Sequence, residues 1–338
     1  MGYLISPTEL EVRRERCRPA VESIASVERQ YEPRCGLCQS EHSCVIADRD
    51  RYGLRLRTAL CTNCGLVYML DRLTQEGYSE FYRGGAYRRF TSSFAGSVAT
   101  IDDLQADQAA YAKNLIAFLD GRVPRRPNVT MLDVGGSSGQ VAKEVATHFG
   151  VDATVLDPSE EEIEAAQRLG LRGVVGSAET WHTQARFDVV LLCRTVEHLF
   201  DLRATMSKIR CYLRPGGLFY CDFLDYMELC RITGAPQTVS KVDHCQWLTL
   251  ETAPAILRAM GFEIVSLHVA PKPPFTGLLL RPCEEEAVAP LAWNDVQERI
   301  RELQQILSDW QRVSGLRASL RQRVGRKVKR MAKGAVGR

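Results

Sequence analysis

Four cysteines in two closely spaced pairs are the clearest chemical signal in this sequence of 338 residues. Cys35 and Cys38 form one CxxC pair and Cys61 and Cys64 form the other, with 22 residues between the pairs. Four thiolates make a closed tetrahedral shell around zinc, which leaves no open position for catalysis. The sequence therefore predicts a structural Zn²⁺ site, with free or redox-active thiols as the alternative.

A glycine-rich turn is the second signal. Residues 131–140 pass from an apolar strand through Gly135, Gly136 and Gly139 into a helix. Glycines let the backbone approach a ligand closely, and the N-terminus of the helix offers free amides. A dinucleotide-binding pattern needs glycine at positions 137 and 140, where this chain has serine and glutamine, so a nicotinamide cofactor is disfavoured. A tight loop without a ligand is the other interpretation.

A single carboxylate follows the next apolar run. Asp157 ends the run 154–157 at the rim of the expected sheet. Ligands of parallel sheets bind at the carboxyl ends of the strands, where a carboxylate accepts both hydroxyl protons of a ribose. Asp157 is therefore a candidate ribose ligand, and capping the helix 160–169 is its alternative role.

Together these patterns resemble the class I S-adenosylmethionine-dependent methyltransferases. Asp133, Gly135 and Gly139 match the family's first motif, whose loop wraps the amino acid part of S-adenosylmethionine, and Ser137 replaces the usual middle glycine. The resemblance implies that Asp157 binds the ribose. It further implies cofactor contacts from Gly136, Ala178, Glu179 and Arg194.

The resemblance continues along about 150 residues in the family's order. Residues 176–179 stand where the family places groups beside the adenine, and residues 193–199 are similar to its Glu-His element. Residues 213–218 match its turn from helix to strand. The order of these motifs implies a methyltransferase fold, with S-adenosylmethionine as cofactor.

A zinc module ahead of such a domain resembles bacterial sugar and natural-product methyltransferases. In carbon-methylating members, a Tyr-His-Glu-His stretch after the fifth strand supplies the base. Residues 241–244 keep the acid and the last histidine, so the resemblance implies His244 as base with Asp243 assisting, and His198 as second candidate. Because the tyrosine and first histidine are missing, we expect O-methylation of a sugar, glycan or small-molecule acceptor, with C-methylation as the alternative.

The elements that must position these residues alternate between short β-type runs and helical segments from residue 128 onward. This alternation predicts an α/β fold with a largely parallel, Rossmann-like sheet of seven strands. The runs 262–269 and 277–280 are too close in sequence for a parallel crossover, so we expect them to pair antiparallel at one end of the sheet. A small zinc ribbon precedes the sheet, and a basic helical tail follows it.

Five segments are expected along the chain. They are a lead-in at 1–30, a zinc module at 31–75, a helical connector or lid at 76–127, the cofactor-binding domain at 128–282, and an amphipathic helical tail at 283–338. The run 121–127, rich in glycine, proline and arginine, marks the border before the domain.

The net charge of +3 is unevenly distributed, because residues 312–338 carry ten Lys or Arg and no acid. We expect a cytoplasmic protein, since no signal peptide or 18-residue apolar run is present. The tail is predicted either to contact an anionic membrane face or glycan-assembly enzymes, or to pack on its own domain or a partner. Two alternative functions remain: a zinc-ribbon RNA or DNA methyltransferase, which the acidic body disfavours, and a non-catalytic binding protein.

Overall fold

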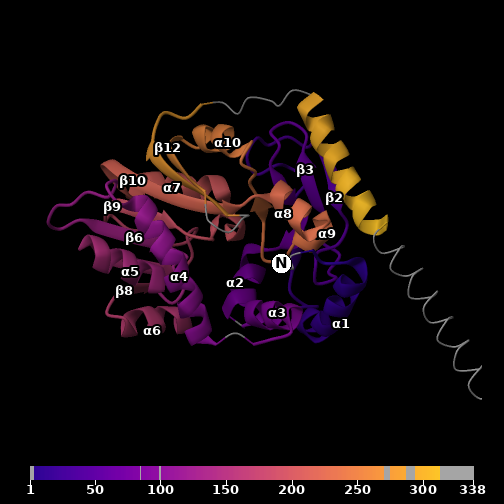
Figure 1. Ribbon diagram of the computed structural model, residues 1–338, viewed down its shortest axis with the longest axis horizontal. Coiled ribbons are helices and arrows are strands. Elements are labelled where there is room, and N and C mark those ends of the chain that lie inside the picture. Colours follow the sequence, from indigo (N-terminus) through magenta and orange to yellow (C-terminus); the bar gives the residue numbers. More distant parts are fainter. Residues whose placement is uncertain (1–3, 84, 99, 270–274, 287–293, 313–338) are drawn as a thin grey trace, which may run out of the picture.

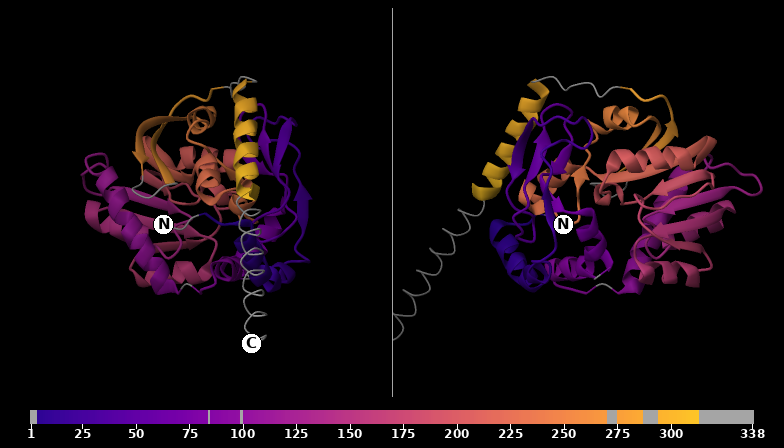
Figure 2. Two further views of the ribbon diagram at one scale, coloured as in Figure 1. Left: turned by 45° about the vertical axis from the view of Figure 1, so that its right-hand side comes forward. Right: turned by 180° about the vertical axis from the view of Figure 1, so that it is seen from behind.

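A computed structural model describes residues 4–83, 85–98, 100–269, 275–286 and 294–312. A large sheet with helices on its faces occupies one side of the molecule, and the N-terminal segments and the last helix occupy the other (Figures 1 and 2). The region 121–127 connects the N-terminal helices to the first strand of the large sheet.

The large sheet has seven strands in the order β12-β13-β10-β9-β6-β7-β8. Its strands are β6 (Thr130–Val134), β7 (Asp152–Asp157), β8 (Arg172–Val175), β9 (Phe187–Leu192), β10 (Leu213–Leu224), β12 (Phe262–Val269) and β13 (Phe275–Pro282). β13 pairs antiparallel with both β10 and β12 at one end of the sheet, as the short spacing predicted. The other pairs are parallel, so the predicted seven-stranded α/β fold is confirmed.

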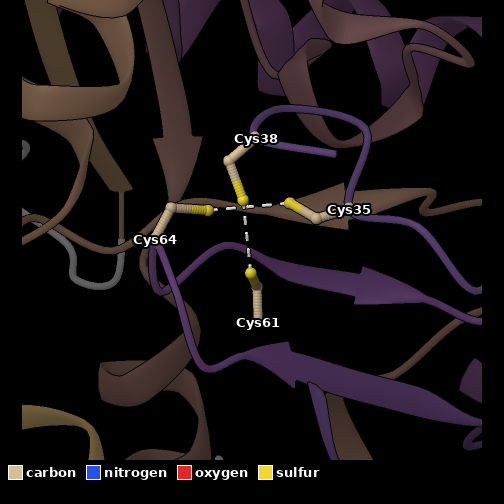
Figure 3. Close-up of side chains that lie close together, drawn as sticks. All are labelled: Cys35, Cys38, Cys61 and Cys64. Atoms are coloured by element: carbon tan, nitrogen blue, oxygen red, sulfur yellow. Dashed lines mark hydrogen bonds between the residues drawn. The ribbon is translucent and has the colours of Figure 1, made fainter. Parts of the chain in front are cut away.

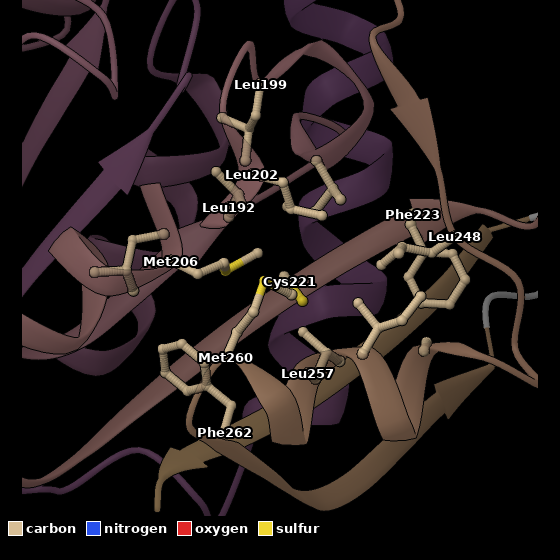
Figure 4. Close-up of a cluster of buried hydrophobic side chains, with 14 of the residues drawn as sticks. Leu192, Leu199, Leu202, Met206, Cys221, Phe223, Leu248, Leu257, Met260 and Phe262 are labelled. Carbon is tan, nitrogen blue, oxygen red and sulfur yellow. The ribbon is translucent and has the colours of Figure 1, made fainter. Parts of the chain in front are cut away.

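Alternate side chains along these strands enter two different cores, because successive residues of a strand face opposite sides of a sheet. On one face, Met131 and Val155 pack against α4 (Ile101–Leu119), α5 (Gln140–Phe149) and α6 (Glu160–Arg168). On the other, Leu192 and Phe223 pack with residues of α7 (Leu202–Tyr212) and α10 (Ala253–Ala259), as Figure 4 shows. Both faces are apolar, which explains why the parallel strands read as nearly continuous hydrophobic runs.

The helices alternate with these strands or precede them. They are α1 (Pro7–Ser23), α2 (Gln75–Arg83), α3 (Ala86–Ala95), α4 (Ile101–Leu119), α5 (Gln140–Phe149), α6 (Glu160–Arg168), the short η1 (Val196–His198), α7 (Leu202–Tyr212), α8 (Tyr226–Thr233), α9 (Pro236–Val239) and α10 (Ala253–Ala259). Residues 294–312 form a further helix. Local signals explain several starts, such as the Thr100 and Asp103 capping box of α4.

The paired cysteines belong to a second, antiparallel sheet with the order β11-β4-β3-β2. Its strands are β2 (Ser43–Ala47), β3 (Thr58–Cys61), β4 (Val67–Met69) and β11 (Gln246–Trp247), while β1 (Arg29–Tyr31) and β5 (Asp71–Leu73) form a separate pair. β11 comes from far along the chain, after β10 of the large sheet. The cysteine-bearing sheet is therefore completed by the same part of the chain that carries the predicted base.

A third core joins the N-terminal segments to the end of the described chain. Leu10 of α1, Phe90 of α3 and Trp247 of β11 share it with Leu303 and Trp310. The indole N–H of Trp310 donates to the carbonyl of Ile5 at 2.6 Å. The helix 294–312 thus packs on the N-terminal part of the molecule, and the rest of the predicted tail, residues 313–338, lies outside the described residues.

No helix within the described residues is both long and apolar enough to cross a bilayer. The five predicted segment boundaries stay predictions.

Candidate functional site

The four predicted zinc ligands converge on one point (Figure 3). The Sγ atoms of Cys35, Cys38, Cys61 and Cys64 all lie within 4.8 Å of one another, and two of the distances between them are 3.6 Å. A tetrahedral zinc site with Zn–S bonds of about 2.3 Å separates its sulfurs by about 3.8 Å. The cluster is therefore compatible with a zinc ribbon.

Both cysteine pairs sit on turns of the same backbone geometry. The N–H of Gln39 donates to the carbonyl of Cys35 at 2.9 Å, and that of Gly65 donates to Cys61 at 3.0 Å. Gln39 and Gly65 have φ of 59° and 75°, in the left-handed region that turns the chain back sharply. In each turn the first cysteine donates its N–H to a carbonyl five residues on, at 2.9 Å. The two turns hold the sulfurs in place independently of each other.

The cysteine-bearing sheet also holds the segment of the predicted base, residues 241–244. The N–H of Met69 in β4 donates to the carbonyl of Cys245 at 2.9 Å, and the N–H of Cys245 donates to Glu197 in η1 at 2.8 Å. The buried carboxyl of Asp50 accepts from the N–H of Val242 at 3.1 Å. The segment is thus held by main-chain bonds of the adjoining Cys245 to the small sheet and to η1, and by the side chain of Asp50.

The glycine turn after β6 has the backbone that its sequence suggested. Gly135 and Gly139 have φ of 69° and 77°. A Cβ at Gly135 would lie 2.6 Å from the side chain of Thr195, and one at Gly139 would lie 2.7 Å from the Cβ of Ala166. Ser137, with φ of 51°, adopts the left-handed region at the position where the family has glycine. Alternate residues of the turn therefore require the conformation that glycine adopts most easily.

Three aspartates lie at or near the carboxyl ends of strands in the large sheet: Asp133 on β6, Asp157 on the adjacent β7, and Asp222 on β10, which β9 separates from β6. Burial, with the charges of Asp157 and Asp222, raises the pKa of Asp133 to about 8. Neither carboxyl oxygen of Asp133 has a hydrogen-bond partner among the described residues. Asp157 accepts the amides of Ser137 and Ser159, each at 2.9 Å, and burial raises its pKa to about 6.

A series of side-chain contacts links the glycine turn to the N-terminal helices. Glu162 of α6 accepts the hydroxyl proton of Ser137 at 2.9 Å. The other oxygen of Glu162 pairs with Arg88 of α3. The sequence gave no sign of this link, because it joins three segments that are distant along the chain.

The remaining predicted cofactor ligands have other partners. The N–H of Arg194 donates to Asp222 at 2.5 Å, and the carboxylate of Glu179 accepts the N–H of Phe200 at 2.8 Å. Ala178 is partly buried against the core of the large sheet. Contact of these residues with the cofactor stays a prediction.

The structure brings both histidine candidates together around one carboxylate. Nδ1 of His198 and Nε2 of His244 lie 3.6 and 3.7 Å from Oδ2 of Asp243. Nζ of Lys241 lies 2.9 Å from the same oxygen and 3.1 Å from Nε2 of His244. Burial raises the pKa of Asp243, but the charge and hydrogen bond of Lys241, with the charge of Arg51, outweigh it, so that pKa is lowered and the carboxylate stays ionised.

The hydrogen bonds assign a different tautomer to each histidine. Nδ1 of His198 lies 3.0 Å from the carbonyl oxygen of Asp243, which can only accept, so Nδ1 carries the proton and Nε2 has the lone pair. The Lys241 ammonium can only donate, so Nε2 of His244 accepts and its buried Nδ1 is the protonated nitrogen. Burial lowers the pKa of His198 to about 4, which leaves the ring neutral. His198 therefore offers the lone pair that a base needs.

Two tyrosines complete the cluster from the N-terminal helices. The hydroxyl of Tyr82 lies 2.9 Å from Nδ1 of His198, and the ring of Tyr87 meets the same imidazole edge-on at 6.1 Å. The sequence placed neither tyrosine in the site, and it gave Lys241 no role. Asp222 could have been found, because it follows an apolar run in the same way as Asp157.

Part of the chain is similar to known methyltransferases. Residues 104–267 match the family model described as a methyltransferase domain. A ubiquinone biosynthesis O-methyltransferase of Methylobacterium nodulans is 29% identical over 143 residues, which cover 39% of this chain and 57% of that protein. The corresponding enzyme of Bradyrhizobium sp. is 32% identical over 28% of this chain and 40% of its own length. The chain thus spans about half the length of these relatives.

One solved structure with a similar fold is the Burkholderia thailandensis 1,6-didemethyltoxoflavin-N1-methyltransferase, at 20% identity and a TM-score of 0.48. That similarity covers 67% of this chain and 96% of the other. The match to the methyltransferase-domain model covers just under half of the chain and includes strands β6 to β10 of the seven-stranded sheet.

Proposed function

We propose that this chain is an S-adenosylmethionine-dependent methyltransferase that methylates an oxygen atom of a sugar, glycan or other small acceptor. The observation that carries the proposal is the left-handed turn of Gly135, Ser137 and Gly139 beside the carboxylate of Asp157. The turn and the carboxylate lie at the carboxyl edge of the parallel sheet, where such sheets bind nucleosides, which supports a ribose-binding role for Asp157.

The residues fit the cofactor in chemical type. Gly135, Gly136 and Gly139 would border its amino acid part, and Asp157 would accept from its ribose hydroxyls. When bound, the cofactor supplies a methyl group on a sulfonium. Burial and the two neighbouring aspartates favour a protonated Asp133, which can donate a hydrogen bond in the same pocket.

The base in this proposal is His198, with His244 as the candidate that the sequence favoured. The acceptor hydroxyl attacks the methyl carbon, a C–O bond forms, and the C–S bond breaks. Nε2 of His198 takes the hydroxyl proton, while Asp243 and Tyr82 hold the ring through Nδ1. S-adenosylhomocysteine and the methyl ether are the products.

Oxygen as the methylated atom is supported by two independent points. The two relatives quoted above are named as O-methyltransferases. The segment 241–244 also lacks the tyrosine and first histidine of the carbon-methylating enzymes that the sequence resembles.

A structural zinc is part of the proposal. The converging sulfurs of the cysteine cluster support it, and His42 and Cys44, which stand between the two pairs in the sequence, are outside the group of four. A closed shell of four thiolates gives the metal no role in methyl transfer.

Cofactor binding is the direct test. In calorimetry we expect S-adenosylmethionine to bind the purified protein, and Asp157→Ala to weaken binding about a hundredfold through loss of charge-assisted bonds to the ribose. Asp157→Asn removes the carboxylate charge but keeps an oxygen that can accept the N–H of Ser137, so it separates these two roles of the side chain. Asp152→Ala, at the exposed start of the same strand, is the control and should bind the cofactor normally. A folded wild-type protein that does not bind the cofactor would leave the binding-protein alternative as the better account.

We also propose that the basic tail contacts an anionic membrane face or glycan-assembly enzymes. Residues 312–338, with ten cations and no acid, support this, and the helix 294–312 attaches the start of the tail to the N-terminal part. Vesicles containing phosphatidylglycerol should sediment the protein, and pure phosphatidylcholine vesicles should not. Replacing Lys327, Lys329 and Arg330 by Glu should weaken binding by about a hundredfold or more, at about 1 kcal/mol for each lost cation. Equal binding to both vesicle types would exclude the electrostatic contact.

A further inference from the structure

A closed ring of hydrogen bonds includes the carboxylate of Asp157. One of its oxygens accepts the N–H of Ser137 and the other accepts the N–H of Ser159, each at 2.9 Å. The hydroxyl of Ser137 donates to the carboxylate of Glu162 at 2.9 Å, and the N–H of Glu162 donates to the hydroxyl of Ser159 at 3.4 Å. Both serines that hold Asp157 are therefore tied in turn to Glu162, one to its side chain and the other to its main chain.

The burial of Glu162 is unusual for an acid in the first turn of a helix. Glu162 is 8% exposed, whereas Glu160 and Glu161 in the same turn of α6 face solvent. Acids in a first turn stabilise a helix through its dipole, and the two exposed glutamates already supply that effect. Acidic side chains are rarely buried unless they are paired. The position of Glu162 therefore indicates a role in the contacts that it makes.

Arg88 of α3 supplies the charge that makes this burial possible. Its guanidinium pairs with one oxygen of Glu162 while the other oxygen accepts from Ser137, so both oxygens of the buried carboxylate have a partner. The charge of Glu162 raises the pKa of Asp157, and the charge of Arg88 lowers it. The arginine thus offsets the repulsion between the two acids and helps to keep Asp157 ionised at neutral pH.

The backbone of Ser137 explains why the glycine turn needs an anchor. At φ of 51°, Ser137 lies in the left-handed region, which glycine adopts freely and which a residue with a Cβ adopts at a cost. Its hydroxyl donates to a charged acceptor, and such hydrogen bonds are stronger than neutral ones. The bond to Glu162 can therefore offset the cost of the conformation.

We propose that Glu162 is a positioning residue for the cofactor, which holds the glycine turn in its left-handed form through the hydroxyl of Ser137 and so aims the carboxylate of Asp157 at the ribose. This rests on the proposed function and extends the cofactor site to two residues, Glu162 and Arg88, whose role requires no contact with the ligand. The serine and the glutamate together do what a glycine at position 137 would do alone. Through Arg88, α3 of the N-terminal part contributes to the same site.

A double-mutant cycle between Glu162 and Ser137 tests this role, with binding of S-adenosylmethionine to the full-length protein measured by calorimetry. We expect Glu162→Ala to weaken binding about ten- to hundredfold through loss of the charge-assisted bond. Glu162→Gln keeps an oxygen that can accept the hydroxyl proton, so it should recover part of that loss. In a Ser137→Gly background, Glu162→Ala should cost less than about threefold, because glycine needs no anchor in this conformation.

Ser137→Ala approaches the same link from the other end. It keeps the Cβ and removes the hydroxyl, so it should bind the cofactor more weakly than Ser137→Gly, which lacks both. Glu161→Ala is the matched control, because it removes an exposed acid from the same turn of α6, and it should bind as wild type does. The melting temperature of each variant is measured first, and the two Ser137 variants test the inference even if Glu162→Ala unfolds.

The outcomes separate this inference from the proposed function. If the folded wild type does not bind S-adenosylmethionine, the proposed function fails. If wild type binds and Glu162→Ala binds equally well, or loses as much affinity with Ser137→Gly as without it, Glu162 does not act through Ser137. Binding to Ser137→Gly that is no tighter than binding to Ser137→Ala would also overturn the inference, and in both cases the function stands.

Discussion

Replacing Cys61 by serine should abolish binding of the proposed zinc and unfold most of the chain. Apparent zinc-binding free energies in small cysteine sites are about 10 to 16 kcal/mol, as large as the whole stability of a typical domain, about 5 to 15 kcal/mol. Even a fraction of that loss leaves the folded state unstable. Metal content by mass spectrometry should fall from one zinc per chain to none, and circular dichroism should show a strongly lowered melting temperature.

The effect should reach beyond the small sheet because the cores are continuous. Leu37, Leu66 and Tyr68 of the cysteine-bearing part belong to the same buried cluster as Leu192 and Phe223 of the large sheet. We therefore expect one cooperative transition in which cofactor binding is lost with the zinc.

Cys44→Ser is the matched control for this prediction. Cys44 lies on β2 of the same sheet but outside the group of four sulfurs. It should keep its zinc and its melting temperature. A Cys61→Ser protein that melts like wild type would contradict a structural zinc.

Replacing His198 by glutamine should lower kcat by about a hundred- to ten-thousandfold, the usual contribution of a general base. Binding of S-adenosylmethionine should be unchanged, because His198 contacts Tyr82 and Asp243 and not the glycine turn. His244→Gln should cost less, since Nε2 of His244 is already occupied by Lys241. The measurement is release of S-adenosylhomocysteine with the acceptor that gives the fastest turnover in a screen.

His268→Gln is the control histidine, on β12 and stacked on Phe118 at 4.4 Å, away from the cluster. Its kcat should match wild type. If His244→Gln loses more activity than His198→Gln, the base is His244, as the sequence favoured, and not His198.

The same histidine predicts a pH dependence. Burial lowers the pKa of His198 from 6.5 to about 4, so the base stays unprotonated and kcat should hold on acidification until the pH approaches that value. The unfolded chain binds more protons than the folded one between these two pKa values. His198 therefore contributes stability that rises with pH across that window, while carboxyls whose pKa burial raises, such as Asp133 and Asp157, act in the opposite direction. The difference in urea unfolding between wild type and His198→Gln, followed over several pH values, isolates the contribution of His198.

Local patterns in the sequence predicted the large sheet well. Apolar runs separated by helical segments marked six of its strands closely, and the short spacing between 262–269 and 277–280 identified the antiparallel pair. The glycine turn was also local, because Gly135 and Gly139 must adopt positive φ where a strand enters a helix. In each case the residues that decide the structure are near one another in sequence.

The acceptor side of the site could not be predicted in the same way. Tyr82, His198 and Lys241 lie on three separate segments, and the main-chain bonds of Cys245 to the small sheet and to η1 help to bring the last two together. The tautomers also depend on those contacts, which is why the sequence favoured His244. No periodicity or spacing carries that information.

The late strand of the small sheet has a consequence for synthesis on the ribosome. β4 pairs with β11 through Tyr68 and Gln246, so its edge stays unpaired until β6 to β10 have all been made. An open strand edge invites pairing with other chains, and the N-terminal part of a protein leaves the ribosome first. Zinc bound early to the four cysteines would keep β3 and β4 together while the edge of β4 is still unpaired. A shortage of zinc during translation should therefore appear as aggregated nascent protein, even where the finished protein keeps its metal tightly.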